Sequence, residues 1–444
     1  MPIEGAIFDC DGTLLDSMPM WTNTCVSLLK RYGVDNAEQV FLEQESLDMD
    51  KKCFWYHEHL GIGESGEALL GELWGMVEHA YRTSVQPFPG CREFLEALAA
   101  ANIPMVIASS TPPELLRIAL GAHGLLDFFG ELILAGDVGR GKEYPDVYLA
   151  ACERLGTSRE KTWVFEDAPF GIRSAARVGF PVAALLNDHD GRDEEFVARW
   201  GTVVARGYHE LSINLLGERE PHVLHALVVA GSPSPSSTEL VALLAQRADY
   251  VVAADRGVER LMVAGVSPHV FCGDEDSCST QASNWAHAHA NAVVRHPVEK
   301  YDTDLGLAID CAYEEAERVG ASLSLTVTCA SGGRPDHALG VWGVLARNAV
   351  FSPVLTEDGF TCHVLAPQGS PSLELDVPVG TVVSAVALAP NTVASERGLR
   401  WELDHASLDV LGDLGVSNRV VSPPAVIECH SGVLAVFVLA KGGE

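Results

Sequence analysis

Short apolar runs that end in polar residues recur between residues 4 and 210, and each is followed by a helix-like stretch. This alternation predicts a parallel sheet with crossover helices, because parallel strands need long connections that usually contain a helix. Residues 17 to 85 interrupt the alternation with helix-like segments and no convincing strand, which indicates a helical cap inserted after the first strand. The apolar runs are GAIFD, PMVIASS, ELILAGD and KTWVFED.

A second series of strands begins after the short polar stretch at residues 217–222, where we place the domain boundary. Helices are expected at roughly 258–264, 304–319 and 336–348, between strands that again end in polar loops. After about residue 350 the pattern changes to short alternating strands, which predicts a β-sandwich. The strands before and after that change are LHALVVAG, DYVVAAD, HVFCGDEDS and LSLTVTCASGG, then FTCHVLA, TVVSAVALA and VIECHSGVLAVFVLA.

These patterns predict an α/β protein of three domains, since 444 residues exceed what one core usually serves. Residues 1–216 form a doubly wound parallel sheet with a helical cap at about 17–85. Residues 223–350 form a second α/β domain, and residues 351–444 form the β-sandwich.

The formal net charge of −31 excludes partners that need a basic surface, namely nucleic acid and anionic membranes. Phosphate substrates would then have to be attracted by bound cations, which indicates Mg²⁺. No run of 18 apolar residues predicts a membrane span, and the N-terminus lacks the basic region of a signal peptide. Eleven cysteines without a CxxC pair are expected to be reduced. We therefore expect a cytoplasmic protein that acts on small molecules.

The first candidate site begins with Asp9, which directly follows the first strand, at the sheet edge where α/β folds place ligands. Its carboxylate can attack phosphorus to form an aspartyl-phosphate. Asp11 can protonate the leaving oxygen and later deprotonate water. Gly12 permits a tight turn, and Thr13 can donate a hydrogen bond to phosphate.

Other residues of this half supply the cation and the fixed donors that such chemistry needs. Ser109 and Lys142 follow later strands and can stabilise the developing negative charge. A hard cation must lie between carboxylate and phosphate. We expect its ligands to be Asp9, Asp11, Glu166 and Asp167.

In this order, the residues resemble the haloacid dehalogenase superfamily of phosphatases, in the branch with a helical cap, over residues 1 to about 210. Sugar-phosphate mutases of that branch have a cap histidine twelve residues past the nucleophile, where this chain has Trp21. This difference favours hydrolysis. Trp21, Trp55 and Trp74 are either cap core or substrate wall.

Acidic loops also follow the strands of the second half: Asp255, then Asp274 to Asp276, and Asp302 with Asp304 at the start of a helix. Such a cluster is expected to hold divalent cations, which in turn hold a polyphosphate. Arg334 and Lys300 could complete a phosphate clamp.

The order of GDEDS, KYDTD and GGRPDH resembles the thiamine pyrophosphokinases, over residues 223 to 444. The resemblance implies transfer of the β,γ-diphosphoryl group of ATP to thiamine with release of AMP, with Mg²⁺ and with ATP as co-substrate. It implies metal or phosphate roles for Asp274, Asp276 and Asp304. The residues implied on the nucleotide or phosphate side are Asp255, Lys300, Asp302, Arg334 and Asp336.

Thiamine lies between two subunits in that family, so the resemblance implies a homodimer formed through the C-terminal half. Ser417 and Asn418 match its thiamine segment, and Trp401 could be the aromatic platform, although a Trp in an alternating strand is often core. Tyr301 stands where the family usually has an aspartate; either Asp302 replaces it by a small shift of the loop, or metal binding is weaker.

The two halves together favour one hypothesis: the first dephosphorylates thiamine monophosphate, and the second converts the freed thiamine to thiamine diphosphate. One alternative joins the same kinase to a general phosphatase for sugar phosphates or damaged metabolites. Another makes the first half a non-catalytic module that binds phosphorylated thiamine.

Overall fold

The computed structural model describes residues 3–44, 49–186, 193–297 and 301–440. The chain divides into two compact units, Met1–Pro221 and His222–Glu444, each with its own sheets and cores. No helix in the described ranges combines the length and the apolar character needed to cross a membrane.

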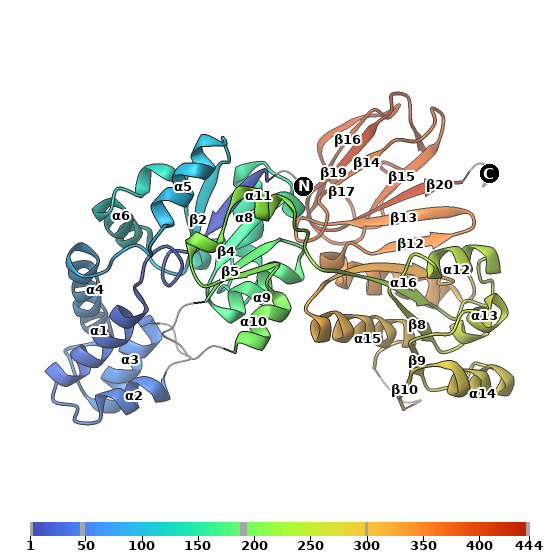
Figure 1. Ribbon diagram of the computed structural model, residues 1–444. Helices are drawn as coiled ribbons and strands as arrows, with labels where there is room; N and C mark the ends of the chain where they lie inside the picture. Colours follow the sequence, from blue (N-terminus) through green and yellow to red (C-terminus); the bar gives the residue numbers. More distant parts are fainter. Residues whose placement is uncertain (1–2, 45–48, 187–192, 298–300, 441–444) are drawn as a thin grey trace. The chain divides into compact units, whose positions relative to one another are not determined.

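The sheet of the first unit consists of parallel strands in the order β3-β2-β1-β4-β5-β6 (Figure 1). The chain moves outward in one direction from β1 through β3, and in the other from β4 through β6. Ligands bind beyond the carboxyl ends of the strands at such a reversal, here between β1 and β4. The strands are β1 Gly5–Phe8, β2 Met105–Ser109, β3 Leu132–Leu134, β4 Thr162–Glu166, β5 Val182–Leu185 and β6 Val203–Ala205.

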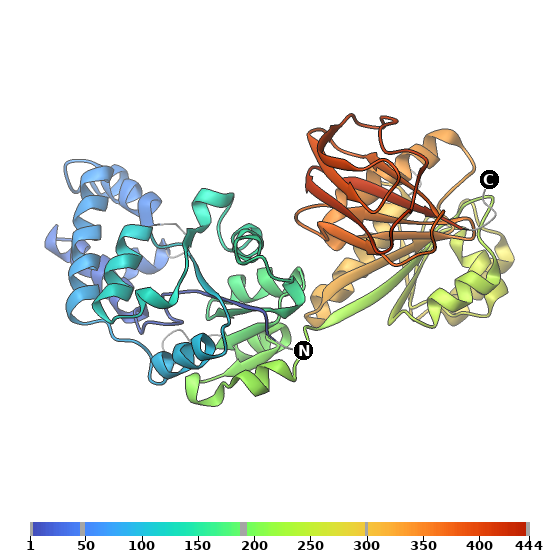
Figure 2. The same ribbon diagram turned by 90° about the horizontal axis from the view of Figure 1, so that it is seen from above.

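Helices connect these strands, as the sequence pattern predicts, and Figure 2 shows them on both faces of the sheet. β1 is buried along its whole length, as expected for a strand with helices on either side. The connecting helices are α5 Cys91–Ala100, α6 Pro113–Ala122, α7 Ala135–Val138, α8 Asp146–Leu155, α9 Pro169–Arg177 and α10 Glu194–Trp200, and α11 Ile213–Gly217 follows the last strand.

The predicted cap is present as α1 Met18–Arg31, α2 Ala37–Glu43, α3 Met49–Leu60 and α4 Gly66–Thr83. Residues spaced four apart on α4, among them Leu69, Leu73, Val77 and Tyr81, are buried, because this spacing places them on one face of a helix. The two linkers of the cap pair with each other: Leu15 forms a bridge with Pro87, and Asp16 N donates to Gln86 O at 2.9 Å. The cap therefore leaves and rejoins the sheet-bearing body at one place.

The second unit contains a ten-stranded sheet in the order β10-β9-β8-β7-β11-β12-β13-β20-β15-β18. Its neighbours are parallel from β10 to β12 and antiparallel from β12 onward. The strands in sheet order are β10 Ala292–Arg295, β9 Val270–Gly273, β8 Tyr250–Ala254, β7 Val223–Val229, β11 Ser322–Thr328, β12 Val354–Glu357, β13 Phe360–Leu365, β20 Leu434–Leu439, β15 Val382–Ala387 and β18 Asn418–Arg419.

Helices cover both faces of the parallel part of this sheet. α15 Asp304–Val319 and α16 Pro335–Arg347 share a core with one face, whereas α12 Thr238–Ala245, α13 Gly257–Ala264 and α14 Thr280–His289 share a core with the other. The helices expected at 258–264, 304–319 and 336–348 are thus confirmed, the middle one with the same bounds.

The expected β-sandwich is present, but one of its two layers is the antiparallel end of the long sheet rather than a separate sheet. The other layer is four-stranded, in the order β14-β19-β16-β17, and packs against β13, β15 and β20 in a common core. Leu434 and Val436 of β20 face this core, while Ala435 between them belongs to the α/β core. The new strands are β14 Ser372–Leu375, β16 Thr392–Arg397, β17 Leu403–Leu408 and β19 Ala425–Ser431.

One sheet continues across the predicted domain boundary near residue 350. The division into two domains at that boundary stays a prediction. We expect residues 222–444 to unfold cooperatively and residues 222–350 not to. The shorter fragment loses Leu355, Cys362, Val364 and Ala435 from the α/β core and leaves β11 without its neighbour β12. Burial of a large apolar side chain is worth about 1.5–3 kcal/mol, so Leu355 and Val364 alone contribute about 3–6 kcal/mol, which is comparable with the lower end of the about 5–15 kcal/mol of a whole domain.

Urea unfolding of both fragments, followed by circular dichroism, measures the difference. A cooperative transition of residues 222–350 alone would instead support an independent α/β domain.

Candidate active sites

Asp9 is positioned by the pairing of β1 with β4. Phe8 lies opposite Phe165, and Asp9 N donates to Phe165 O at 2.9 Å, so the residues that follow the two strands lie side by side. Gly12 adopts φ +80°, and a Cβ there would lie 2.1 Å from Asp167 Oδ2. Only glycine permits both this conformation and the close approach of Asp167.

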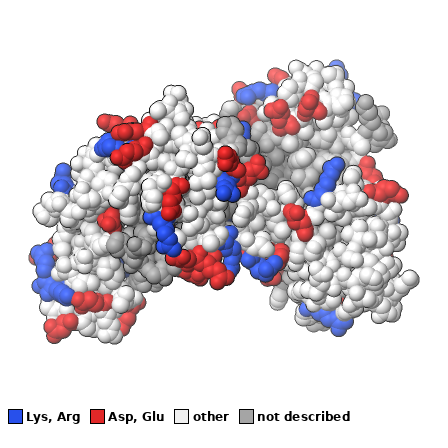
Figure 3. Space-filling view, in the orientation of Figure 1, with Lys and Arg blue, Asp and Glu red and all other residues white. Residues whose placement is uncertain are grey.

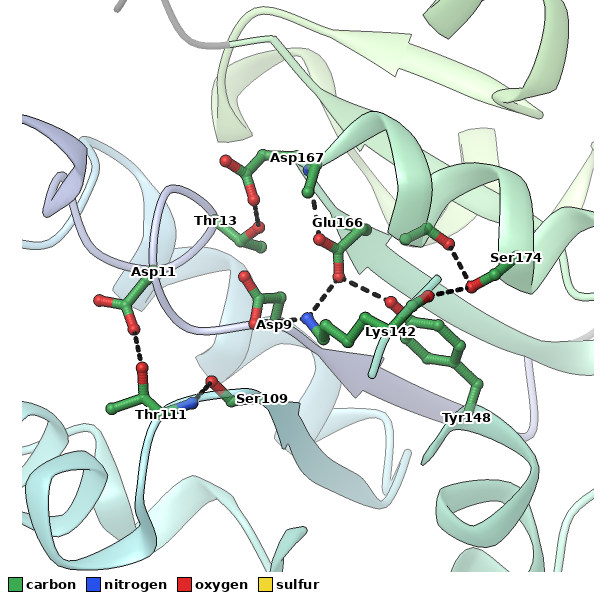
Figure 4. Close-up of polar contacts among 12 residues, drawn as sticks. Asp9, Asp11, Thr13, Ser109, Thr111, Lys142, Tyr148, Glu166, Asp167 and Ser174 are labelled. Atoms are coloured by element: carbon green, nitrogen blue, oxygen red, sulfur yellow. Dashed lines mark hydrogen bonds and ion pairs between the residues drawn. The ribbon is translucent and has the colours of Figure 1, made fainter. Parts of the chain in front are cut away.

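Lys142 lies between two buried carboxylates at this edge of the sheet (Figure 4). Its Nζ is 2.6 Å from Asp9 Oδ1 and 2.7 Å from Glu166 Oε2. Tyr148 Oη also donates to Glu166 Oε2, at 3.0 Å, and Ser174 Oγ donates to the backbone oxygen of Lys142 at 2.5 Å. The lysine is thus held at both its backbone and its ammonium group.

The charges of this group depend strongly on burial. Burial raises the pKa of Asp9 well above its usual range, and the neighbouring Lys142 opposes that shift. Burial would lower the pKa of Lys142, but the charges of Asp9 and Glu166 raise it above its ordinary value. Asp9, Glu166 and Asp167 each offer an oxygen within 4.8 Å of the others, and such a donor set fits a hard cation, which would favour the ionised form of Asp9.

The carboxylate of Asp11 accepts hydrogen bonds from hydroxyl groups. Asp11 is not one of the three residues, Asp9, Glu166 and Asp167, whose oxygens lie close enough together to hold a metal ion. It accepts hydrogen bonds from Ser17 Oγ and Tyr81 Oη, both at 2.6 Å, and from Thr111 Oγ1 at 2.7 Å. Its acid–base role and its metal role both stay predictions.

The two remaining predicted donors lie on either side of Asp9. Thr13 Oγ1 donates to Asp167 Oδ1 at 3.0 Å, so in this conformation Thr13 orients a candidate metal ligand. Ser109 is buried at the end of β2, and its Oγ accepts from Thr111 N at 3.1 Å. Sequence reasoning missed Ser17, Tyr81 and Thr111, whose hydroxyls come from three separate segments without a common motif.

In the second unit, Asp255, Asp274 and Asp276 offer oxygens that lie within 4.8 Å of one another. Burial raises the pKa of Asp255, and the charges of Asp304 and Asp274 raise it further. The charge of Asp304, at the start of α15, therefore acts on the same cluster. Asp255 is buried and its Oδ1 has no hydrogen-bond partner within the described residues, which leaves that oxygen available to a cation.

Other residues expected on the nucleotide side are not among the three carboxylates of this group. Arg334 and Asp336 form an exposed pair with each other, with Nη2 2.6 Å from Oδ2, and the hydrogen bond from Arg334 lowers the pKa of Asp336 to about 2. Burial raises the pKa of Asp310 on α15, and the charge of Asp302 raises it further. Lys300 lies outside the described residues.

A hollow of about 560 Å³ opens beside the carboxyl ends of β7, β8 and β9. Arg256 and Arg260 line it, together with Ser232 and Ser277. Arg256 Nε donates to Ser277 O at 3.1 Å, next to the acidic cluster. Sequence reasoning missed both arginines, although Arg256 follows Asp255 directly and Arg260 lies one helical turn further on.

The segment expected to bind thiamine contains one exposed aromatic ring and one buried amide. Trp401 is 58% exposed, with Arg400 over its ring at 5.1 Å. Asn418 is buried, and its amide holds the backbone of Trp401, with Trp401 N donating to Oδ1 at 3.1 Å and Nδ2 donating to Trp401 O at 2.7 Å. Ser417 is exposed and has φ +61°.

A buried carboxylate that sequence reasoning did not identify lies behind this segment. Asn418 Nδ2 donates to Glu396 Oε2 at 2.9 Å, whereas Glu396 Oε1 has no partner in the described part of the chain. Burial raises the pKa of Glu396 to about 7, and the hydrogen bond from Asn418 opposes the shift. Asn418 thus acts in this conformation as the support of Trp401.

The candidate site residues of the two units lie mainly in segments that match known families. Residues 3–179 match the model of haloacid dehalogenase-like hydrolases, residues 241–353 match the thiamin pyrophosphokinase catalytic domain, and residues 372–434 match the vitamin B1 binding domain of the same family. The chain is a haloacid dehalogenase-like hydrolase fused to a thiamin pyrophosphokinase. The hydrolase unit is a phosphatase, and the pyrophosphokinase unit is a thiamin diphosphokinase.

Relatives of the hydrolase unit act on several phosphate esters, as their names state. The chain is 31% identical to validoxylamine A 7'-phosphate phosphatase of Streptomyces hygroscopicus subsp. limoneus, over 42% of this chain and 86% of the relative. It is 28% identical to phosphorylated carbohydrates phosphatase of Thermotoga maritima, over 42% and 88%. The pyrophosphokinase unit is similar to a solved thiamin pyrophosphokinase family protein of Enterococcus faecalis, with 24% identity, 49% and 99% coverage and a TM-score of 0.42.

Removal of the Lys142 charge is expected to destabilise the hydrolase unit. Lys142→Met leaves Asp9 and Glu166 buried without their shared cation, which costs about 3–5 kcal/mol of unfolding free energy. Mg²⁺ should restore part of the loss by binding among the same carboxylates. Urea unfolding with chelator and with Mg²⁺ measures both effects.

Lys161→Met is the matched control, because Lys161 pairs with Glu4 at 2.8 Å but both side chains are about one-third exposed. Such a pair is worth about 1 kcal/mol or less. Equal losses of unfolding free energy in the two variants would show that the buried ion pairs of Lys142 stabilise the unit no more than the partly exposed pair of Lys161 does.

Glu396 is expected to make the pyrophosphokinase unit less stable as pH rises from about 4.5 to about 7. In that window the folded state keeps a proton that the unfolded chain releases. Glu396→Gln cannot ionise, so it should be more stable than the natural chain at pH 8, by about 1–3 kcal/mol, and nearly equal to it at pH 4.5.

Urea unfolding of residues 222–444 at both pH values measures this difference. Glu374→Gln, at an exposed position of β14, should change stability little at either pH. A Glu396→Gln variant with the pH dependence of the natural chain would contradict the prediction.

Proposed function

We propose that the hydrolase unit removes the phosphate of thiamine monophosphate and that the pyrophosphokinase unit converts the resulting thiamine to thiamine diphosphate. The observation that carries the proposal is the fusion itself: one chain contains a phosphomonoester hydrolase and an enzyme whose acceptor is thiamine. A pyrophosphokinase needs the free alcohol, so a monophosphate must first lose its phosphate. The chemistry of the first unit supplies the substrate of the second.

In the hydrolase unit, Asp9 attacks phosphorus while the bond to the ester oxygen breaks, and an aspartyl-phosphate forms. Asp11 gives its proton to the leaving oxygen and then takes one from the water that hydrolyses the intermediate. Lys142 and Ser109 stabilise charge on the phosphoryl oxygens. Mg²⁺ held by Asp9, Glu166 and Asp167 would offset the repulsion between carboxylate and phosphate.

In the pyrophosphokinase unit, Asp255, Asp274, Asp276 and Asp304 surround the place where the polyphosphate of ATP would bind. Mg²⁺ at these carboxylates would neutralise the phosphate charge. Arg334 and Asp336 lie on the loop and helix that follow β11 and are assigned to the nucleotide side. The products are thiamine diphosphate and AMP.

Thiamine binding is assigned to Trp401, Ser417 and Asn418, of which Asn418 supports Trp401 through hydrogen bonds from its side-chain amide to the backbone of Trp401. Exposed apolar side chains surround this segment, including Leu414 and Val416. Such a surface is suited to a partner subunit. We assign it to a homodimer formed through the C-terminal half.

A second candidate keeps the kinase and gives the hydrolase unit sugar phosphates as substrates. The names of its relatives favour this candidate, since one acts on phosphorylated carbohydrates. Both candidate functions use the same catalytic residues around Asp9. They differ only in the part of the substrate that the cap contacts.

A substrate panel separates the candidates. We expect kcat/KM of the purified chain for thiamine monophosphate to exceed that for fructose 1-phosphate and glycerol phosphate by about tenfold or more, the effect of about 1.4 kcal/mol of transition-state binding. Given thiamine monophosphate and Mg-ATP, the chain should form thiamine diphosphate and AMP. No release of phosphate from the monophosphate would rule out this substrate.

Two variants test which unit releases phosphate and which unit forms thiamine diphosphate. Asp9→Asn should abolish phosphate release and leave thiamine diphosphate formation from thiamine nearly intact, while Asp276→Ala should do the reverse. A phosphatase rate unchanged in Asp9→Asn would place the nucleophile elsewhere.

A further inference from the structure

Glu357, the last residue of β12, places a buried carboxylate at the carboxyl end of the parallel strands of the second unit. Its Oε1 accepts hydrogen bonds from Ala330 N at 2.8 Å and from Ser331 N at 3.0 Å, and its Oε2 accepts from Cys329 N at 3.1 Å. Three consecutive amides of the loop after β11 therefore donate to one carboxylate. Hydrogen bonds to a charged acceptor are stronger than those between neutral groups, so this loop is firmly held.

The loop after β11 begins with a backbone conformation that needs such support. Cys329 adopts φ +56°, in the left-handed region that residues with a Cβ rarely occupy. A residue keeps this conformation only where the contacts around it fix it. The amide of Cys329 is bound by Glu357, and its carbonyl oxygen accepts from Ser232 N at 2.9 Å. Both polar groups of the strained peptide are thus held.

The same carboxylate also binds the loop after β7, residues 230–237. Ser236 is buried, and its Oγ donates to Glu357 Oε2. The two loops are in close contact, because a Cβ on Gly333 would lie 2.7 Å from Pro233 Cδ. Glu357 therefore connects two loops that are far apart in the chain and adjacent in the fold.

Both loops border the place assigned to the nucleotide. Arg334, which is assigned to the nucleotide side, comes three residues after Ser331. Pro233 and Pro235 of the other loop line the hollow of about 560 Å³ beside the carboxyl ends of β7, β8 and β9. Arg260 lines the same hollow, and its Nη2 donates to Pro235 O at 3.1 Å. A shift of either loop would change the walls of this site.

We propose that Glu357 is a positioning residue of the pyrophosphokinase: its carboxylate fixes the loops after β11 and β7 in the arrangement that receives ATP. This inference rests on the proposed nucleotide role of Arg334. Glu357 is assigned no contact with a substrate. Without its carboxylate, the two loops would have to become ordered when ATP binds, and this ordering lowers the affinity for ATP.

Steady-state kinetics of Glu357→Gln in the full chain test the proposal. In either orientation of the new side-chain amide, its NH₂ group faces at least one backbone N–H, so donors oppose each other. We expect KM for Mg-ATP to rise about tenfold or more, the effect of losing one hydrogen bond to a charged group. KM for thiamine and kcat at saturating Mg-ATP should change about threefold or less, within the scatter of such contributions.

Ser236→Ala is a second, milder variant. It removes only the hydroxyl that binds the β7 loop to Glu357, and the three amides of the other loop keep their acceptor. KM for Mg-ATP should rise in this variant too, by a smaller factor than in Glu357→Gln. Urea unfolding checks that each variant is folded under the conditions of the assay.

Asp249→Asn is the control. The carboxylate of Asp249 also accepts from a backbone amide, with His225 N donating to Oδ2 at 3.0 Å, but at the opposite end of β7 and β8. This variant changes a carboxylate–amide contact in the same unit and touches neither loop, so KM for Mg-ATP and kcat should stay at the natural level. Equal values of KM for Mg-ATP in Asp249→Asn and Glu357→Gln would overturn the positioning role.

Arg334→Gln separates this inference from the function on which it rests. If Arg334→Gln leaves KM for Mg-ATP unchanged, the nucleotide role of the loop fails, and the positioning role of Glu357 fails with it. If Arg334→Gln raises KM for Mg-ATP but Glu357→Gln and Ser236→Ala do not, only the positioning role is overturned. A Glu357→Gln variant that loses stability or kcat while both KM values stay unchanged would also overturn it, since Glu357 would then serve the fold alone.

Discussion

The ion pairs of Lys142 are the interaction on which the first candidate active site depends. Parallel pairing of β1 with β4 brings Asp9 next to Glu166 and Asp167, and three buried carboxylates at one strand edge would repel one another. One ammonium group within 2.7 Å of two of them offsets that repulsion. The lysine thus permits a concentration of negative charge that a hard cation and a phosphate ester can use.

In the second candidate active site, the repulsion between carboxylates is reduced in another way. Its carboxylates also follow parallel strands, but Asp255 is buried while Asp276 lies at the surface, where water reduces the repulsion. Arg256 and Arg260 line the adjacent hollow. A large, highly charged nucleotide is suited to such an open site, whereas a phosphatase benefits from a cap that limits the access of bulk water.

The main elements of both units, and the residues at their strand ends, could be predicted from the sequence. The alternation of apolar and polar residues is local, so it identified β1, β2, β4 and the bounds of α15. It could not show that β12 and β13 extend the α/β sheet, because alternation in a strand does not specify its neighbour. The sandwich therefore shares a layer with the α/β part, a result of hydrogen bonding between strands far apart in sequence.

The sequence by itself determined where the candidate catalytic groups lie: Asp9, Asp11, Lys142 and the acidic loops come after strands, and the carboxyl ends of parallel strands meet at one edge. Only the tertiary structure decided what holds those groups. The hydroxyls of Ser17, Tyr81 and Thr111 meet at Asp11 from segments up to about a hundred residues away, and Asn418 is committed to Trp401 and Glu396. The physical reason is that hydrogen bonds between side chains depend on packing across the fold, which no local pattern of residues records.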